Sequence, residues 1–142
     1  MKYNSAFFIL FENIFMLIKD EFNEKKSLEI FSKLMKKGLS ASYGNNFIKG
    51  QSSEFVRLVQ ERDNLVGLRV NFPIVTENEI IYQFIDDPFP NLKGLVNEEK
   101  LDACFIDFKI KYILGENWAY KNTKHIWRED NVTEYRIYKL FS

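Results

Sequence analysis

The stretch Val66-Gly67-Leu68-Arg69-Val70-Asn71-Phe72 decides the fold class, because apolar and polar residues alternate along it. Alternation with a period of two is typical of a β-strand that buries one face. Pro73 marks either the end of this strand or a bulge at the edge of a sheet. The chain turns at residues 76–79 into a second apolar segment at residues 80–85, so the two segments are predicted to pair as a hairpin.

A stretch before this hairpin, residues 6–18, has apolar residues at helical spacing. It is well short of the roughly 20 apolar residues that span a bilayer. It also lacks the small-residue cleavage site of a signal peptide, which favours a core or interface helix. Because Phe8, Phe15 and Met16 make its second face apolar too, this helix is either central to the fold or covered by a partner subunit. A homodimer through the N-terminal helix is therefore left open.

Two more helices are predicted before the hairpin. Ser27 can cap the first of them, and the glycine–asparagine run at residues 44–46 ends it. Ser52 or Ser53 can cap a shorter third helix that stops near residue 63.

The second half of the chain continues from the hairpin with a helix and two further β segments. After a loop at residues 86–94, Asn97 caps a helix that Gly115 ends. The apolar face predicted for this helix consists of Leu101, Cys104, Phe105, Phe108 and Tyr112. β segments at residues 118–127 and 132–140 flank a turn at residues 128–131. The prediction is an α+β fold in a single domain over residues 1–142. Residues 1–64 are mainly helical, and residues 65–142 follow the order β-β-α-β-β, an antiparallel sheet of two hairpins crossed by a helix.

The composition argues against several classes of protein. The 142 residues hold 20 Lys and Arg against 20 Asp and Glu, so the basic surplus of a general nucleic-acid or anionic-membrane binder is absent. A single Cys and a single His argue against a disulfide framework within the chain and against a zinc or iron–sulfur site built by the protein. We expect no metal, no cofactor, no nucleic-acid or membrane partner, and a cytoplasmic location.

Few residues can carry chemistry. Cys104, the one thiol of the sequence, is predicted on an apolar helix face, and this favours packing because apolar surroundings raise the pKa of a thiol. Asp107 follows on the same helix and either orients a ligand or a water, or forms an ion pair with Lys111. His125 has no acid or nucleophile near it in the sequence, so a catalytic role needs a partner that the fold brings.

Aromatic residues on the predicted strands either line a pocket or pack as core. They are Tyr82, Trp118, Tyr120, Trp127 and Tyr135. Their hydroxyl and indole groups can converge on a ligand, which gives a second set of candidate residues.

The order of motifs in the second half is more informative than any single residue. The hairpin is followed by the loop Asp86-Asp87-Pro88-Phe89-Pro90, the helical element Cys104-Phe105-Ile106-Asp107, the run Asn122-Thr123-Lys124-His125-Ile126, and a closing run from Asp130 to Arg136. Over about residues 53–139, this series resembles the L-2-amino-thiazoline-4-carboxylic acid hydrolase-like family. That family is similar in architecture to the vinyl-reductase-type and haem-NO-binding/Golgi-transport ligand-binding superfamily. Asp87 and Thr133 stand where the family has two of its three cysteines.

The resemblance implies a small-molecule pocket between helix and sheet, and hydrolytic opening of an aminothiazoline ring at a cyclic amidine C–N bond. Cys104 is then either the nucleophile or a wall of the pocket, Asp107 positions water, and His125 moves a proton. The expected ligand-binding residues are Arg69, Tyr82, Phe108, Trp118, Tyr120, Thr133 and Tyr135. The alternative is a non-catalytic small-molecule-binding or sensory domain, which the missing cysteines favour.

Overall fold

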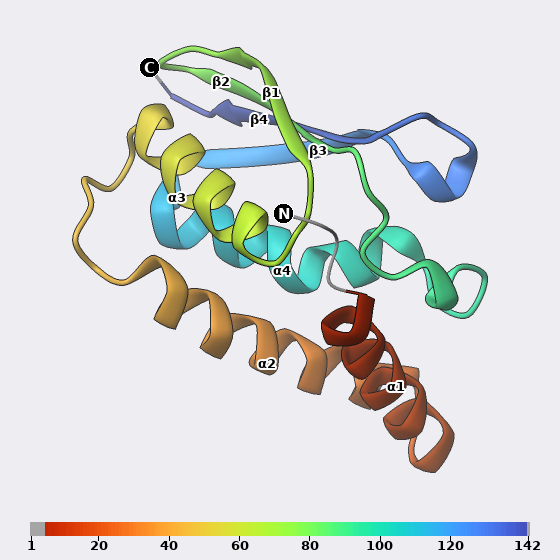
Figure 1. The fold of residues 1–142 in the computed structure, drawn as a ribbon. Helices are drawn as coiled ribbons and strands as arrows, with labels where there is room; N and C mark the ends of the chain where they lie inside the picture. The colour runs from red at the N-terminus through yellow and green to blue at the C-terminus, as the bar shows by residue number, and fades with distance from the viewer. Residues whose placement is uncertain (1–4, 142) are drawn as a thin grey trace.

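Helices come first along the chain and a four-stranded sheet closes the fold, as the sequence predicts (Figure 1). The computed structural model describes residues 5–141. The helices are α1 (Ser5–Glu21), α2 (Glu24–Tyr43), α3 (Ser52–Leu65) and α4 (Glu98–Ile113), and the strands are β1 (Val70–Val75), β2 (Glu79–Phe84), β3 (Trp118–Lys124) and β4 (Thr133–Lys139). Two short 3₁₀ turns, η1 (Pro90–Leu92) and η2 (Ile126–Arg128), lie in loops of this described region. The fold class is α+β.

The sheet has the strand order β1-β2-β4-β3, and every neighbouring pair is antiparallel. Pro73 lies inside the edge strand β1, where the pairing register shifts between Asn71 and Ile74. Of the two predicted alternatives for Pro73, the structure shows the edge bulge and not the strand end, since proline cannot donate to the ladder of a central strand. β1 begins later than predicted, because residues 66 and 67 form the turn that leaves α3. Gly67 makes that turn with a φ of 82°, a left-handed conformation that suits glycine.

One face of the sheet packs on helices. Figure 1 shows α3 and α4 against this face, with α2 on the far side of α4 and α1 against α2. Alternate residues of β2 are buried toward the helices, and Tyr82 of β2 stands directly opposite Tyr135 of β4. The other face carries polar residues bonded across strands, such as Gln83, whose amide donates to Glu134 at 2.7 Å. Apolar-in and polar-out alternation is what an antiparallel sheet covered on one face requires.

The helix starts correct two predictions. Asn23, not Ser27, caps α2 by accepting a hydrogen bond from the Lys26 amide at 2.8 Å. Ser27 is buried inside α2, where its hydroxyl donates to the Phe15 carbonyl at 2.7 Å and ties α2 to α1. The N-cap of α3 is Gln51, one residue before the predicted serines.

The start of α4 confirms a third prediction, and its buried face corrects a fourth. Asn97 caps this helix, since its side chain accepts from the Lys100 amide at 3.0 Å. Phe108 and Tyr112 are only partly buried, whereas Asp102 and Lys109 are buried against the sheet.

The β3 strand is shorter than predicted, because His125 leaves the ladder and caps η2. The His125 ring accepts a hydrogen bond from the Trp127 amide at 3.0 Å, a local bond that competes with strand pairing. None of the helices within residues 5–141 is long and apolar enough to cross a membrane.

Candidate functional site

A cleft lies between α2 and α4 on the side of α4 that faces away from the sheet. Its volume is about 400 Å³, within the range of small-molecule sites. The lining residues are Ser32, Lys36, Lys49, Ala103, Cys104, Asp107, Phe108, Lys111 and Tyr112. We call this the α2–α4 cleft.

Helical spacing explains why one side of α4 builds most of this cleft. Cys104, Asp107, Phe108 and Lys111 follow at intervals of three, one and three residues, which places them on one face of the helix. The ring of Phe108 stacks on that of Tyr112 at 5.0 Å and forms an aromatic floor. The Tyr112 hydroxyl donates to the carbonyl of Gly44, and this bond ties the end of α2 to α4.

The α2–α4 cleft carries more positive than negative side chains. Lys36, Lys49 and Lys111 line it, and none of them forms an ion pair with any described residue. Asp107 is the single carboxylate among the lining residues. The ion pair between Asp107 and Lys111, one of the two sequence-based alternatives, is not formed. Asp107 lies instead near Tyr120, whose pKa is raised by burial and by this carboxylate.

Cys104 lies in the cleft wall as a protonated thiol. Its sulfur is 3.5 Å from the carbonyl oxygens of Leu28 and Lys100, both of which accept from the thiol. Burial raises the pKa of Cys104 to about 12, and the carboxylates of Asp102 and Asp107 add to the effect. At pH 7 only about one thiol in 10⁵ is ionised, so the reactive thiolate is nearly absent.

His125 lies in a separate polar cluster and does not line the α2–α4 cleft. Its Nε2 is 3.0 Å from Oδ2 of Asp102, and its Nδ1 accepts the Trp127 amide hydrogen. Because Nδ1 is an acceptor, the ring carries its proton on Nε2 and donates it to Asp102. The Tyr135 hydroxyl donates to the same carboxylate oxygen. The structure therefore does not bring His125 together with Cys104 and Asp107.

Thr133 and Tyr120 adjoin this His125 cluster. Thr133 is buried, and its hydroxyl oxygen accepts the Ile126 amide hydrogen at 3.1 Å. The Tyr120 ring meets the Tyr135 ring edge-on at 5.9 Å.

Tyr82 belongs to a second buried cluster, with Asp63 and Lys109. The Tyr82 hydroxyl donates to Oδ2 of Asp63, and the Lys109 Nζ lies 2.9 Å from the hydroxyl and 3.3 Å from Oδ1 of Asp63. Asp63, Asp102 and Lys109 are not among the candidate residues that the sequence predicts. A signal was available for two of them, since Asp102 and Lys109 are seven residues apart and lie on one face of α4.

Arg69 and Trp118 lie apart from both clusters and from the cleft. Arg69 is exposed, and its guanidinium pairs with Asp86 at 2.7 Å. Trp118 is buried at the start of β3, with the Lys139 ammonium 6.0 Å from its ring. The predicted site residues thus fall into three groups. Cys104, Asp107 and Phe108 line the cleft, His125, Thr133, Tyr120, Tyr135 and Tyr82 lie at the buried clusters on the sheet side of α4, and Arg69 and Trp118 lie apart from both.

Comparison with protein-family models and with curated proteins gives no match for this chain. Within the described residues, no group of three or more His, Cys, Asp or Glu side chains could hold a metal ion.

Proposed function

We propose that this chain is a small-molecule-binding protein whose ligand is a small carboxylate-bearing cyclic amidine, such as L-2-amino-thiazoline-4-carboxylate. The observation that carries the proposal is the charge of the α2–α4 cleft, where three lysines without acidic partners face one carboxylate. A ligand carboxylate suits the ammonium groups of Lys36, Lys49 and Lys111, and a protonated amidine suits Asp107. The half-buried ring of Phe108 supplies an apolar surface for a flat ring.

Binding without thiol chemistry fits the environment of Cys104 better than hydrolysis by a thiolate. The raised pKa of Cys104 keeps the thiol protonated, and the one histidine is bonded to Asp102 elsewhere. Cys104 then serves as a wall of the cleft.

A second candidate function is hydrolysis of the cyclic amidine C–N bond with Asp107 as the general base. The observation that favours it is the exposure of Asp107 in the α2–α4 cleft, where a water molecule can reach the carboxylate. Asp107 would accept a proton from this water as the water oxygen attacks the amidine carbon, and would return that proton to the ring nitrogen as the C–N bond breaks and its electron pair moves to nitrogen. The resemblance to the aminothiazoline hydrolase-like family supports this reaction class.

One experiment tests binding and hydrolysis together. The purified protein is incubated with L-2-amino-thiazoline-4-carboxylate, its melting temperature is recorded, and ring-opened product is sought by mass spectrometry. A ligand held only by the folded state at 100 times its Kd stabilises it by about 2.7 kcal/mol, which raises the melting temperature by roughly 10 °C. Stabilisation without product supports binding alone, whereas product that disappears in Asp107→Asn supports hydrolysis.

A matched pair of lysine variants locates the ligand. Lys36→Ala removes a cleft ammonium group, and the control Lys37→Ala removes the neighbouring exposed one, which does not line the cleft. We expect ligand stabilisation to fall in Lys36→Ala only. Equal stabilisation of both variants, or no stabilisation of the unsubstituted protein, contradicts the proposal.

We also propose that two copies of the chain associate through α1 and that the protein is cytoplasmic. Leu10 and Leu17 support the dimer, because they lie seven residues apart on α1 and are 58% and 61% exposed. The single cysteine supports the location. Analytical ultracentrifugation should show a dimer that Leu10→Gln/Leu17→Gln dissociates, whereas Leu65→Gln, an exposed leucine of α3, leaves it intact. Cell fractionation tests the location.

A further inference from the structure

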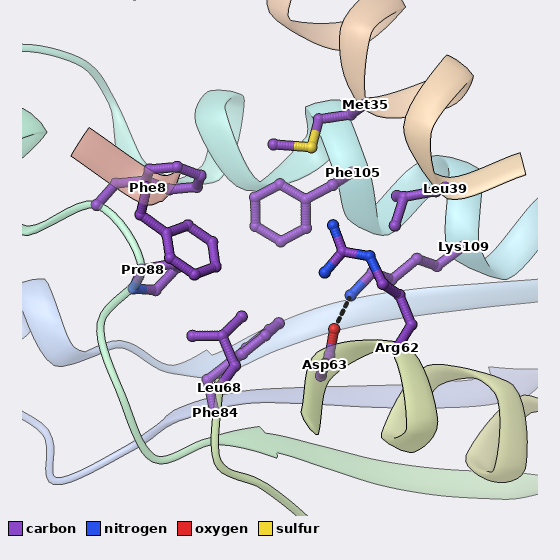
Figure 2. Close-up of a pocket in the computed structure, with 11 residues that line it drawn as sticks. Phe8, Met35, Leu39, Arg62, Asp63, Leu68, Phe84, Pro88, Phe105 and Lys109 are labelled. Carbon is purple, nitrogen blue, oxygen red and sulfur yellow. Dashed lines mark hydrogen bonds and ion pairs between the residues drawn. The ribbon is translucent and has the colours of Figure 1, made fainter. Parts of the chain in front are cut away.

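A second cavity lies between α2, α3, α4 and the inner face of the sheet, and it shares no lining residue with the α2–α4 cleft. Figure 2 shows Phe8 and Pro88 at one end of it and the side chains of Arg62, Asp63 and Lys109 at the other. Its volume is about 30 Å³. A single water needs about 10–15 Å³, so the space accommodates about two non-hydrogen atoms.

Lys109 lines this cavity, and its amino group lies among aromatic rings. Its side chain is 4% exposed, and its Nζ lies 5.3 to 5.6 Å from the ring centres of Tyr82, Phe84 and Phe105. Two hydrogens of the amino group are engaged by Asp63 and by the Tyr82 hydroxyl. A neutral amine donates only two hydrogens, so these two contacts use both of them and leave the lone pair of the nitrogen unengaged, in a residue that lines the cavity.

The charges around Lys109 favour the neutral amine. Arg62 also lines the cavity and places a second cationic side chain beside Lys109, whereas Asp63 is the single carboxylate among the lining residues. Burial lowers the pKa of Lys109; Asp63 opposes this shift, and Arg62 reinforces it. A lysine desolvated next to another cation is a recurrent source of nucleophilic amines.

Arg62 is available to a ligand. Its guanidinium lies 6.0 Å from the ring centre of Phe7, and it forms no ion pair with a carboxylate of residues 5–141. Arg62 is only partly buried, so the group that it binds does not have to fit inside the cavity. Guanidinium groups bind carboxylates through two parallel hydrogen bonds.

We infer that Lys109 forms an imine with a short α-oxo acid, with Arg62 binding the carboxylate of that acid. The carbonyl carbon and oxygen match the space for about two atoms, and the adjoining carboxylate reaches Arg62. The Lys109 nitrogen bonds to the carbonyl carbon while the carbonyl electron pair moves to oxygen, and one proton passes from nitrogen to that oxygen to give a carbinolamine. The nitrogen then gives its second proton to the departing hydroxyl, which leaves as water as the C–N double bond forms, so the products are one imine and one water with no change in oxidation state.

Trapping of the imine tests this inference on the unsubstituted protein. The protein is incubated at pH 7 with glyoxylate and cyanoborohydride, which reduces the imine to a stable carboxymethyl amine, and modified lysines are mapped by mass spectrometry. Exposed Lys37 of α2, which lines neither the cavity nor the α2–α4 cleft, is the internal reference. We expect Lys109 to be modified several-fold faster than Lys37, because the neutral amine is the nucleophilic form. Modification of Lys109 that is equal to or slower than that of Lys37 overturns the inference.

Two α3 variants test the role of Arg62. Acetaldehyde has a methyl group in place of the carboxylate of glyoxylate. We expect it to be trapped at Lys109 about tenfold more slowly than glyoxylate. Arg62→Met should abolish the preference for glyoxylate over acetaldehyde, and Arg57→Met, an exposed arginine of the same helix, should keep it. A preference that survives in Arg62→Met overturns the assignment of Arg62. Because the cavity and the α2–α4 cleft have no residue in common, either result is independent of the proposed function.

Discussion

Replacing Lys109 with methionine should destabilise the protein strongly, because it isolates a buried carboxylate. Asp63 is 1% exposed and receives hydrogen bonds from Lys109 and Tyr82. Lys109→Met removes one donor to Asp63 and one to the Tyr82 oxygen, and methionine cannot replace either. Losing a hydrogen bond to a buried carboxylate costs about 1.5–3 kcal/mol; because the Tyr82 oxygen loses a donor as well, we expect about 3 kcal/mol. This lowers the melting temperature by roughly 10 °C.

Urea denaturation at pH 7 measures this loss of stability. Two further variants serve as an exposed control and as a test of the buried carboxylate. The exposed control Lys111→Met should change the free energy of unfolding by less than about 0.5 kcal/mol. The double variant Asp63→Asn/Lys109→Met should recover most of the stability, since a neutral amide still accepts from Tyr82 without leaving a buried charge. A cost below about 1 kcal/mol for Lys109→Met, or no recovery in the double variant, refutes this account of the cluster.

The same variant has a defined pH dependence. Burial lowers the pKa of Lys109 in the folded protein, so the unfolded chain binds more protons between that lowered pKa and about 10.4. The Lys109 contribution to the free energy of unfolding therefore rises with pH across this window. Denaturation between pH 7 and pH 10 should show the unsubstituted protein gaining stability relative to Lys109→Met, and a constant difference contradicts the shift.

Three further predictions follow from single contacts. Alkylation of Cys104 by iodoacetamide should be slow at pH 7 and should accelerate about tenfold per pH unit toward its pKa of about 12; fast alkylation at pH 7 contradicts a protonated thiol. Tyr135→Phe removes the hydroxyl that donates to Asp102 and should cost about 1–3 kcal/mol in urea denaturation, and an unchanged midpoint argues against this bond. Asn97→Ala removes the cap of α4 and should lower the free energy of unfolding by about 1 kcal/mol, whereas a neutral effect would show that the cap bond is weak.

The fold class follows from the sequence because each local pattern agrees with the tertiary structure. The change to a period of two after residue 65 predicts the sheet, and Pro73 predicts the edge position of β1. The errors lie where a side chain that could cap a helix forms a hydrogen bond with a distant element instead. Ser27 has the residue type of a cap, yet a hydrogen bond to α1 holds it inside α2, and that long-range partner is not visible in a local pattern.

The candidate site could be predicted only in part, because helical spacing reports a face and not what lies against it. Cys104, Asp107 and Phe108 share a face of α4, and they do line one cleft. Spacing could not supply Lys36 or Lys49, which the packing of α2 and the following loop bring to that face. Nor could it show that His125 meets Asp102, since this contact joins residues 23 positions apart on different elements.

Buried polar clusters are the feature that local sequence patterns predict least. Asp63 and Lys109 stand outside the apolar faces that the sequence predicts, and in the core each forms a hydrogen bond with the other. Pairing of this kind is a tertiary property.

The most direct test of the proposed function is a map of amide chemical shifts during titration with L-2-amino-thiazoline-4-carboxylate. The account predicts saturable shifts that centre on Lys36, Asp107 and Lys111, around the α2–α4 cleft. Absence of shifts at high ligand concentration, or shifts confined to residues far from this cleft, would contradict it.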